Sequence, residues 1–140
     1  MVVDKKAQGK KNRQSGVNFE RRIRADLEKQ GYIVTKWLNQ VDFVKDTLIP
    51  APHKFNFFTK SITPGQGFPD FLAYKMDTKE IIGVESKSGK YLDQEEKKRC
   101  KWLLEHKIFE TIKVGFKDSK GHINYYEVTE EMLNGKTKKT

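Results

Sequence analysis

Two short apolar runs, each bounded by an acidic residue, constrain this chain more than any other feature. Asp70 precedes the first run, Phe71-Leu72-Ala73-Tyr74, and the second run, Ile81-Ile82-Gly83-Val84, leads into Glu85-Ser86-Lys87. The length and the β-branched or aromatic content of both runs are typical of buried strands. Because side chains alternate along a strand, Glu85 and Lys87 point to the same side. If the two strands pair, they bring two carboxylates and one ammonium group together.

Two carboxylates at one place repel each other unless a cation lies between them. Hard divalent ions with oxygen ligands suit this position, so the sequence predicts a site for Mg²⁺, with Mn²⁺ as a substitute, held by Asp70 and Glu85. The alternative is a surface ion pair between Lys87 and a nearby acid, which contributes only ~0–1 kcal/mol when exposed. That alternative does not explain why one lysine and two acids stand at the ends of adjacent strands.

The remaining periodicity predicts an α/β fold in which helices cover a mixed sheet. A stretch without regular structure, 38–66, is expected to interrupt it after the first strand. The expected elements are a helix from Ser15 or Asn18 to about Gln30, strands at 32–37, 71–74, 81–84, 111–116 and 123–128, a helix from the capping box Asp93-x-x-Glu96 to about His106, and a short helix at 129–133.

The order of these elements and acids resembles the PD-(D/E)XK nuclease superfamily, with Pro69-Asp70 and Glu85-Ser86-Lys87 as its two halves. Roughly residues 16–130 are similar in outline to virus-type replication-repair nuclease (VRR-NUC) domains and to archaeal and viral Holliday junction resolvases. The resemblance implies a restriction-endonuclease-like αβββαβ core with an insert after the first strand. It also implies Mg²⁺-dependent hydrolysis of DNA. The segment 38–66 is longer than in compact resolvases, which bears on the substrate more than on the chemistry.

Glu20 is a further candidate ligand on the first helix. At about 100° per residue it lies within roughly 60° of the apolar stripe formed by Phe19, Ile23 and Leu27. A carboxylate facing a core needs a partner. The family's first-helix acid falls at the same place, which implies metal binding or catalysis. The alternative is an ion pair between Glu20 and Arg24.

Three more positions have candidate roles, the first of them through the resemblance. The backbone carbonyl of Ser86 is implied as a third protein ligand of the metal. Lys87 is a mobile cation whose pKa shifts readily, so it can orient or deprotonate the attacking water or stabilise the transition state. Gln94, near the start of the second helix, is a candidate for positioning water or phosphate, and its alternative is an exposed first-turn residue.

The formal charge of +9 is concentrated at the two ends of the chain. Residues 1–15 carry +4 and residues 134–140 carry +3, and both are expected to be disordered basic tails flanking a nuclease domain at 16–133. Such tails either attract phosphates or serve solubility. The candidate DNA-binding residues are Lys10, Lys11, Arg13, Arg21, Lys54, Lys60, Ser61 and Lys90.

The segment 38–66 holds phenylalanines that a purely solvated loop would not contain, among them Phe55, Phe57 and Phe58. They can cover the core, form a partner surface or stack on unpaired bases. Trp102 falls on a different side of its helix from the inner face, so it is either a partner contact or packed beneath a loop. Because symmetric cutting of a four-way junction requires two active sites, a homodimer is expected, and these aromatic groups are candidates for its interface.

Composition excludes several other classes of protein. A single cysteine, Cys100, rules out an internal disulfide and a cysteine-based zinc site. The three histidines show no metal-ligand spacing, and neither a signal peptide nor an apolar run of membrane-spanning length is present. A soluble protein of the cell interior is therefore expected.

The sequence predicts a Mg²⁺-dependent DNA endonuclease that acts on branched structures, as Holliday junction resolvases do, in recombination, repair or replication. Two alternatives stay open: a nucleic-acid-binding protein that has kept the fold without activity, and a nuclease for flaps, nicks or single strands. A metal-free RNA endonuclease of the tRNA-splicing type would need a histidine, tyrosine and lysine trio, which is not evident in the sequence.

Overall fold

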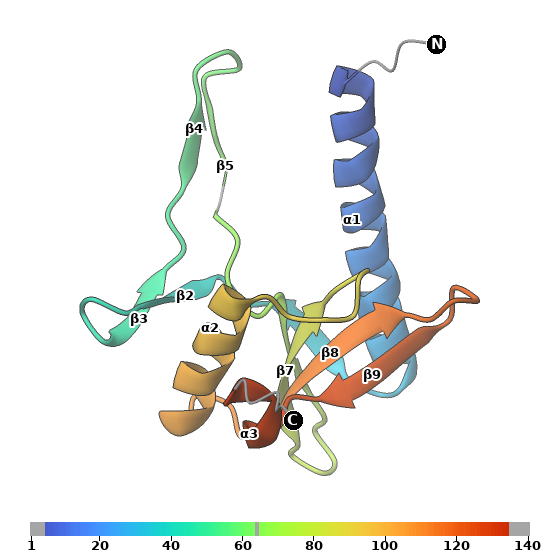
Figure 1. The fold of residues 1–140 in the computed structure, drawn as a ribbon, viewed down its shortest axis with the longest axis vertical. Helices are drawn as coiled ribbons and strands as arrows, with labels where there is room; N and C mark the ends of the chain where they lie inside the picture. The colour runs from blue at the N-terminus through green and yellow to red at the C-terminus, as the bar shows by residue number, and fades with distance from the viewer. Residues whose placement is uncertain (1–4, 64, 135–140) are drawn as a thin grey trace, which may run out of the picture.

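The computed structural model describes residues 5–63 and 65–134, with the side chains of 5–14 and of Thr63 left out (Figure 1). Its elements are α1 (Lys5–Lys29), β1 (Ile33–Lys36), β2 (Asn39–Asp42), β3 (Thr47–Pro50), β4 (Lys54–Asn56), β5 (Ser61–Thr63), β6 (Phe71–Tyr74), β7 (Ile81–Ser86), α2 (Gln94–Glu105), β8 (Ile112–Lys117), β9 (Ile123–Glu127) and α3 (Glu130–Leu133).

Five of the strands form one mixed sheet in the order β1-β6-β7-β8-β9. Strands β7 and β8 are parallel, because α2 carries the chain from the end of one back to the start of the other. The other three neighbouring pairs are antiparallel. The predicted α/β class with a mixed sheet is confirmed, and so is the expected order of the main elements.

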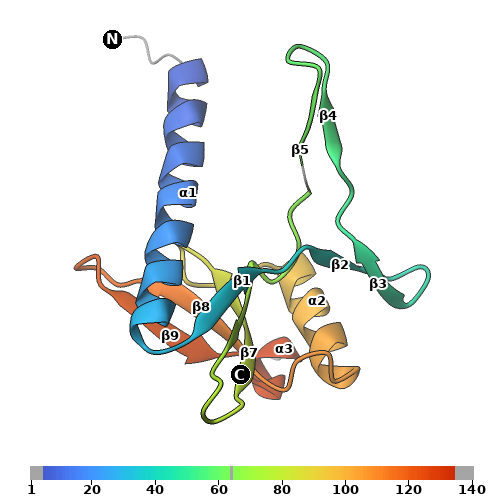
Figure 2. The same ribbon diagram turned by 180° about the vertical axis from the view of Figure 1, so that it is seen from behind.

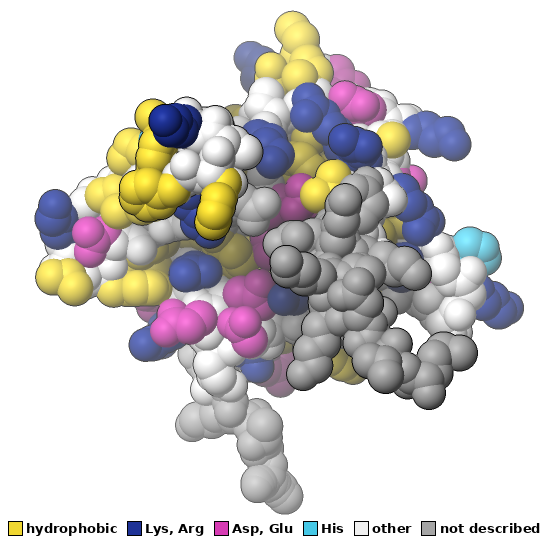
Figure 3. Space-filling view, turned by 90° about the horizontal axis from the view of Figure 1, so that it is seen from above, with side chains coloured by type: hydrophobic (Ala, Val, Ile, Leu, Met, Phe, Trp, Pro, Cys, Tyr) yellow, Lys and Arg dark blue, Asp and Glu magenta, His cyan; other side chains and the backbone are white. Residues whose placement is uncertain are grey.

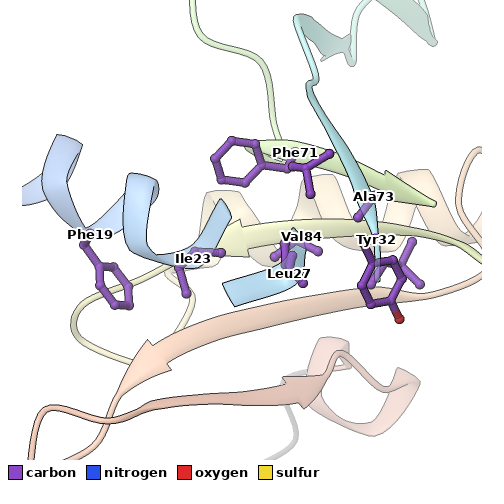
Figure 4. Close-up of a cluster of buried hydrophobic side chains, with 9 residues drawn as sticks. Phe19, Ile23, Leu27, Tyr32, Phe71, Ala73 and Val84 are labelled. Carbon is purple, nitrogen blue, oxygen red and sulfur yellow. The ribbon is translucent and has the colours of Figure 1, made fainter. Parts of the chain in front are cut away.

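Helix α1 packs on one face of the sheet through the stripe that its sequence predicted. Phe19, Ile23 and Leu27 are buried against Phe71 and Val84 and other residues of the same face (Figure 4). Their spacing of four residues keeps them on one side of the helix. This packing fixes the C-terminal half of α1 against the central strands, and with it the position of Glu20.

Helix α2 covers the opposite face. Cys100 and Leu103 pack there on Ile112 and Val114 of β8. Trp102 is also buried: its indole Nε1 donates to Asp46 Oδ1 at 2.7 Å, in the turn between β2 and β3. Of the two alternatives for Trp102, packing beneath a loop is therefore correct.

Helix α1 begins at Lys5, before the start that Ser15 or Asn18 as caps predicted. Residues 5–15 are thus helical where the sequence predicted a tail. They contain no proline and several good helix formers, so the helix continues through the weaker cap signals. Residues 1–4 and 135–140 of the two expected tails lie outside the described residues. None of the described helices is both long and apolar enough to cross a membrane.

The segment 38–66 contains regular structure that the sequence did not predict. It forms two hairpins, β2–β3 and β4–β5, whose turns share one design. Asp42 Oδ1 accepts the N–H groups of Val44 and Lys45, and Asn56 Oδ1 accepts those of Phe58 and Thr59. Strands such as Asn39–Asp42 and Lys54–Asn56 contain no apolar run like that of β6, so the sequence does not mark them, and turns closed by a side chain define them instead.

The chain that leads from the hairpins to Asp70 is held closely against the end of β1. Phe68 N–H donates to the Asn39 carbonyl at 3.0 Å, and Trp37 N–H donates to the Asp70 carbonyl at 3.1 Å. Gly67 lies so close to this connection that an added Cβ would overlap the Trp37 carbonyl and lie 2.7 Å from Asn39 N. Only glycine fits there.

We predict that Gly67→Ala lowers the free energy of unfolding by about 1–3 kcal/mol or more, because the obstructing atoms belong to the backbone and cannot rotate away. Gly16→Ala is the matched control. Nothing lies within 4 Å of its added Cβ, and alanine favours a helix, so this variant should gain up to about 1 kcal/mol. Urea unfolding followed by circular dichroism measures both, and an unchanged midpoint for Gly67→Ala would contradict the packing described.

Candidate active site

Asp70 and Glu85 meet at one edge of the sheet because β6 and β7 are antiparallel neighbours. Phe71 pairs with Val84, so the start of β6 adjoins the end of β7. Each acid then accepts a hydrogen bond from the other strand. Asp70 N–H donates to Glu85 Oε1 at 3.1 Å, and Ser86 donates to Asp70 Oδ2 through its N–H at 3.0 Å and its hydroxyl at 2.6 Å. The predicted convergence of the two strand ends is therefore observed.

Glu85 is the buried charged residue of the site, with 7% of its surface exposed. Burial is the largest cause that raises the pKa of its carboxyl well above the ordinary value, and the charges of Asp70 and Glu96 add to it. Lys87 and the hydrogen bond from Asp70 act in the opposite direction but do not cancel the rise. The site thus carries more negative charge than its own lysine balances.

Lys87 is held by Glu96, an acid of α2 that the sequence indicated only as part of a capping box. Its ammonium group lies 2.9 Å from Glu96 Oε1 and 3.0 Å from Oε2. Although burial lowers the pKa of Lys87, the hydrogen bond and charge of Glu96 raise it above the ordinary value overall. The capping box also forms, since Glu96 Oε1 accepts the Asp93 N–H. Glu96 therefore both begins α2 and positions the lysine.

Glu20 is half-buried on α1, and the charge of Asp70 acts on its carboxyl group. Burial first, and then the charge of Asp70, raise the pKa of its carboxyl, while Lys36 lowers it. The sequence left open an ion pair between Glu20 and Arg24, but the Arg24 side chain makes other contacts instead. The Arg24 guanidinium donates to the Val34 carbonyl at 2.9 Å and lies 3.7 Å from Glu28.

Two open hollows flank the paired acids. The hairpin-side hollow, of about 820 Å³, is lined by Gln40, Pro52, Lys54, Gly65, Gln66, Gly67, Phe68, Asp70, Glu85, Glu96 and Arg99. The helix-side hollow, of about 520 Å³, is lined by Ser15, Gly16, Phe19, Glu20, Ser86, Lys87, Ser88, Gly89, Tyr91 and Lys117. Asp70 and Glu85 open into the first hollow and Lys87 and Glu20 into the second, so the sheet edge forms the ridge between them.

The other predicted residues are more dispersed. Gln94 is exposed at the first position of α2, whereas Glu96, two residues later, reaches the site. Lys87 and Glu96 are nine residues apart, and their contact depends on how α2 docks on the sheet, so no local spacing in the sequence reveals it. The structure places Glu96 and Arg99, which sequence reasoning missed, beside the acids.

The candidate DNA-binding residues fall into three groups. Arg21, Lys60 and Ser61 are exposed, and Lys54 lines the hairpin-side hollow. Lys90 lies over the rings of Tyr91 and Phe116, at 5.4 and 5.2 Å from their centroids. The last group, Lys10, Lys11 and Arg13, belongs to the part of α1 whose side chains are not described.

The donor set for a metal ion consists of two carboxylates. Asp70 accepts its hydrogen bonds on Oδ2 and Glu85 on Oε1, so a cation would be bound through the second oxygen of each. Over residues 5–63 and 65–134, no group of three or more His, Cys, Asp or Glu side chains is arranged to hold a metal. The acid pair suits an oxygen-binding divalent cation, because such an ion offsets the mutual repulsion that raises the pKa of Glu85.

We predict that Glu85→Gln raises the melting temperature in EDTA at pH 8 by a few degrees. The folded protein keeps a proton on Glu85 at pH values where the unfolded chain has lost it. Stability is therefore lost as pH rises from the ordinary glutamate pKa through the raised one. Glutamine is neutral at every pH and retains the oxygen that accepts the Asp70 N–H, so its advantage should shrink as pH falls toward 4.5.

Glu105→Gln, at the exposed end of α2, is the matched control and should leave the melting temperature nearly unchanged throughout. Differential scanning fluorimetry from pH 4.5 to 8 gives both curves. A Glu85→Gln variant that is less stable than the parent at pH 8 would show that Glu85 is charged and well compensated.

Comparison of the chain with protein-family models, with curated proteins and with solved structures found no match in any of the three.

Proposed function

We propose that this protein is a metal-dependent endonuclease that hydrolyses DNA phosphodiester bonds, with branched DNA as its substrate. One observation carries the proposal. Asp70 and Glu85 lie where β6 begins and β7 ends, and each carboxylate accepts a backbone N–H, from Ser86 and Asp70 respectively; Lys87 follows one residue beyond β7. Paired acids with a nearby lysine at the open edge of a sheet suit phosphoryl chemistry.

The fold supports this reading. The order α1, β1, β6, β7, α2 and β8 follows the αβββαβ core of the PD-(D/E)XK superfamily, and the two hairpins stand at the place of the insert. Helices on both faces of the sheet leave its edge at Asp70 and Glu85 accessible between the two hollows. Specific membership of that superfamily is part of the proposal.

Asp70 and Glu85 would hold the metal, together with the Ser86 carbonyl that the family resemblance implies. Mg²⁺ bound there would polarise a phosphate oxygen and lower the pKa of a bound water. The excess of negative charge around Glu85 supports this assignment, because a buried carboxylate facing two other acids is stabilised by a divalent cation. Burial, and after it the charge of Asp70, raises the pKa of Glu20, so Glu20 is a candidate to reach the ion through a bound water.

Lys87 acts as a cation in this scheme. Its pKa is raised, so it holds its proton firmly and donates hydrogen bonds to a phosphate oxygen or to the attacking water. Glu96 keeps its ammonium group at the sheet edge. Lys54 and Arg99 line the hairpin-side hollow with Asp70 and supply positive charge for the neighbouring phosphates.

We predict that Asp70→Asn, Glu85→Gln and Lys87→Ala each lower cleavage by about 100-fold or more without unfolding the protein. The assay uses end-labelled four-way junction, flap, nicked duplex, intact duplex and single strand, each with Mg²⁺, Mn²⁺ or EDTA. Asp77→Asn, exposed between β6 and β7, is the control and should cut like the parent.

Robust cutting by the Asp70 or Glu85 variant would overturn the metal site. Absence of cutting by the parent in every metal, combined with tight DNA binding, would favour the inactive binding protein. The ion pair of Lys87 with Glu96 is the observation that keeps this second candidate in view, since a lysine bound to an acid is less available to a phosphate.

A homodimer belongs to the same proposal, because two strands of a junction need two active sites. Trp102 is buried, which removes it from the candidate interface; Phe55, Phe57 and Phe58 are exposed, but lysines flank them with no acid in the hairpin to pair with, so we place the interface on another surface. We predict a dimer by light scattering at micromolar concentration, with four-way junction or without it. A protein that stays monomeric in both conditions and nicks one strand is better described as a flap, nick or single-strand nuclease.

A further inference from the structure

The β4–β5 hairpin exposes aromatic rings away from the body of the protein. Phe58 is 100% exposed, Phe57 81% and Phe55 50%, and Ile62 on the facing strand is 66% exposed. In Figures 1 and 2 this hairpin projects from the sheet on the same side as the N-terminal half of α1. Contiguous exposed apolar groups of this kind mark an interaction surface.

The turn holds these rings outward through its own hydrogen bonds. Asn56 Oδ1 accepts from Phe58 N–H at 2.9 Å and from Thr59 N–H at 3.2 Å, and the hydroxyls of Thr59 and Ser61 lie 2.6 Å apart. Lys60 takes the left-handed conformation that completes the turn, with φ of 54°. The ring of Phe57 meets that of Phe55 edge to face, with centroids 4.9 Å apart. The tip is therefore preorganised without contact to the core.

The neighbouring β2–β3 hairpin shows that exposure is not a general property of this segment. It has the same turn design, yet Val41 and Leu48 pack on the cluster around α2 and the turn residue Asp46 binds Trp102. The residues of β4 are all exposed. An isolated two-stranded hairpin is marginally stable in water, so apolar residues at its tip are better explained by a ligand than by folding.

The charge of the hairpin identifies the class of ligand. Between Asp46 and Asp70 the sequence contains no acidic residue, while Lys54 and Lys60 flank the rings. Figure 3, seen from the side on which the hairpin projects, shows hydrophobic side chains with Lys or Arg side chains beside them at the upper left. A second copy docked tip to tip would bring lysine against lysine with no acid in the hairpin to pair them. An anionic ligand with flat apolar faces meets both requirements.

We propose that Phe57 and Phe58 stack on unpaired bases of the DNA substrate, while Lys60 contacts the adjoining phosphate. Every base has a face that can stack on a phenyl ring, and stacked bases inside an intact duplex are not accessible from the side. The hairpin therefore selects DNA with unpaired bases, such as a fork, a bubble or a single strand. This inference rests on the proposed function for its substrate, and it adds the structural class that the hairpin favours.

The hairpin reaches the same substrate as the candidate active site. Lys54, at its base, lines the hairpin-side hollow with Asp70 and Glu85. Phe58 is four residues further on, a reach of at most about 13 Å at ~3.3 Å per residue. At ~3.4 Å per base step this reach spans about four nucleotides, and the width of the hollow adds to the separation between the stacked base and the scissile phosphate. Cleavage should therefore fall several nucleotides from the boundary between paired and unpaired DNA, at a fixed distance from it.

The test measures binding in EDTA, so that it does not depend on cleavage. Fluorescence anisotropy compares an intact duplex, the same duplex with a central unpaired stretch, and the single strand. The double variant Phe57→Ala/Phe58→Ala should weaken binding to the two unpaired DNAs by about fivefold to a hundredfold and to the duplex by less than about twofold. The single variant Phe58→Trp should keep the tight binding of the parent. The fluorescence of the new tryptophan should be quenched by the two unpaired DNAs and not by the duplex.

The β2–β3 hairpin supplies a matched control. Phe43 and Val44 occupy the same two turn positions as Phe57 and Phe58, and Val44 is 96% exposed. Phe43→Ala/Val44→Ala should bind all three DNAs like the parent. Lys60→Ala should weaken all three by similar factors, because a phosphate contact does not distinguish them.

The outcomes separate this inference from the nuclease proposal. Selective binding that the double variant loses supports the hairpin inference even if no DNA is cut in Mg²⁺. Equal binding of all three DNAs by the parent and the double variant overturns the inference, even if both proteins cut DNA. If sedimentation shows a parent dimer that the double variant cannot form, while selectivity for unpaired DNA is unchanged, the tip binds a second copy and the inference is wrong.

Discussion

Two backbone hydrogen bonds, from Asp70 N–H to the Glu85 carboxylate and from Ser86 N–H to the Asp70 carboxylate, determine the geometry of the site where β6 begins and β7 ends. Each acid accepts from the backbone of the other strand, so neither can move without breaking the start of the pairing between Phe71 and Val84. Buried backbone donors need partners, and here carboxylates provide them. The consequence is a pair of acids fixed close together, with a raised pKa at Glu85. Everything proposed about metal binding depends on this arrangement.

Helix α2 links that edge to the rest of the protein. Its first turn contains Glu96, which closes the capping box with Asp93 and grips Lys87, and its inner face buries Cys100 and Leu103. Glu96 thus caps α2, positions Lys87 and contributes to the raised pKa of Glu85. Burial raises the pKa of the Cys100 thiol to about 12, in keeping with a packing role for this cysteine.

The segment 38–66 forms two hairpins with similar turns but different surroundings. One is docked on α2 through Trp102 and Asp46, and it holds the chain that approaches Asp70 through the contacts of Asn39 with Phe68. The other projects from the sheet and presents its rings to solvent. The same turn chemistry therefore serves structure in one hairpin and, in our proposal, substrate selection in the other.

The sequence alone determined the strands around Asp70 and Glu85, the stripe of α1 and the cap of α2, because each is a local pattern of alternation, four-residue spacing or capping chemistry. It did not determine that α1 begins at Lys5 or that short hairpins fill the insert, since helix-forming residues continue through the candidate caps and the hairpin strands contain no apolar run like that of β6. Only the tertiary structure brought Glu96 to Lys87, buried Trp102 and left Phe58 exposed. Those outcomes depend on how α2 and the hairpins dock, and docking is a property of distant residues in contact that no single stretch of sequence encodes.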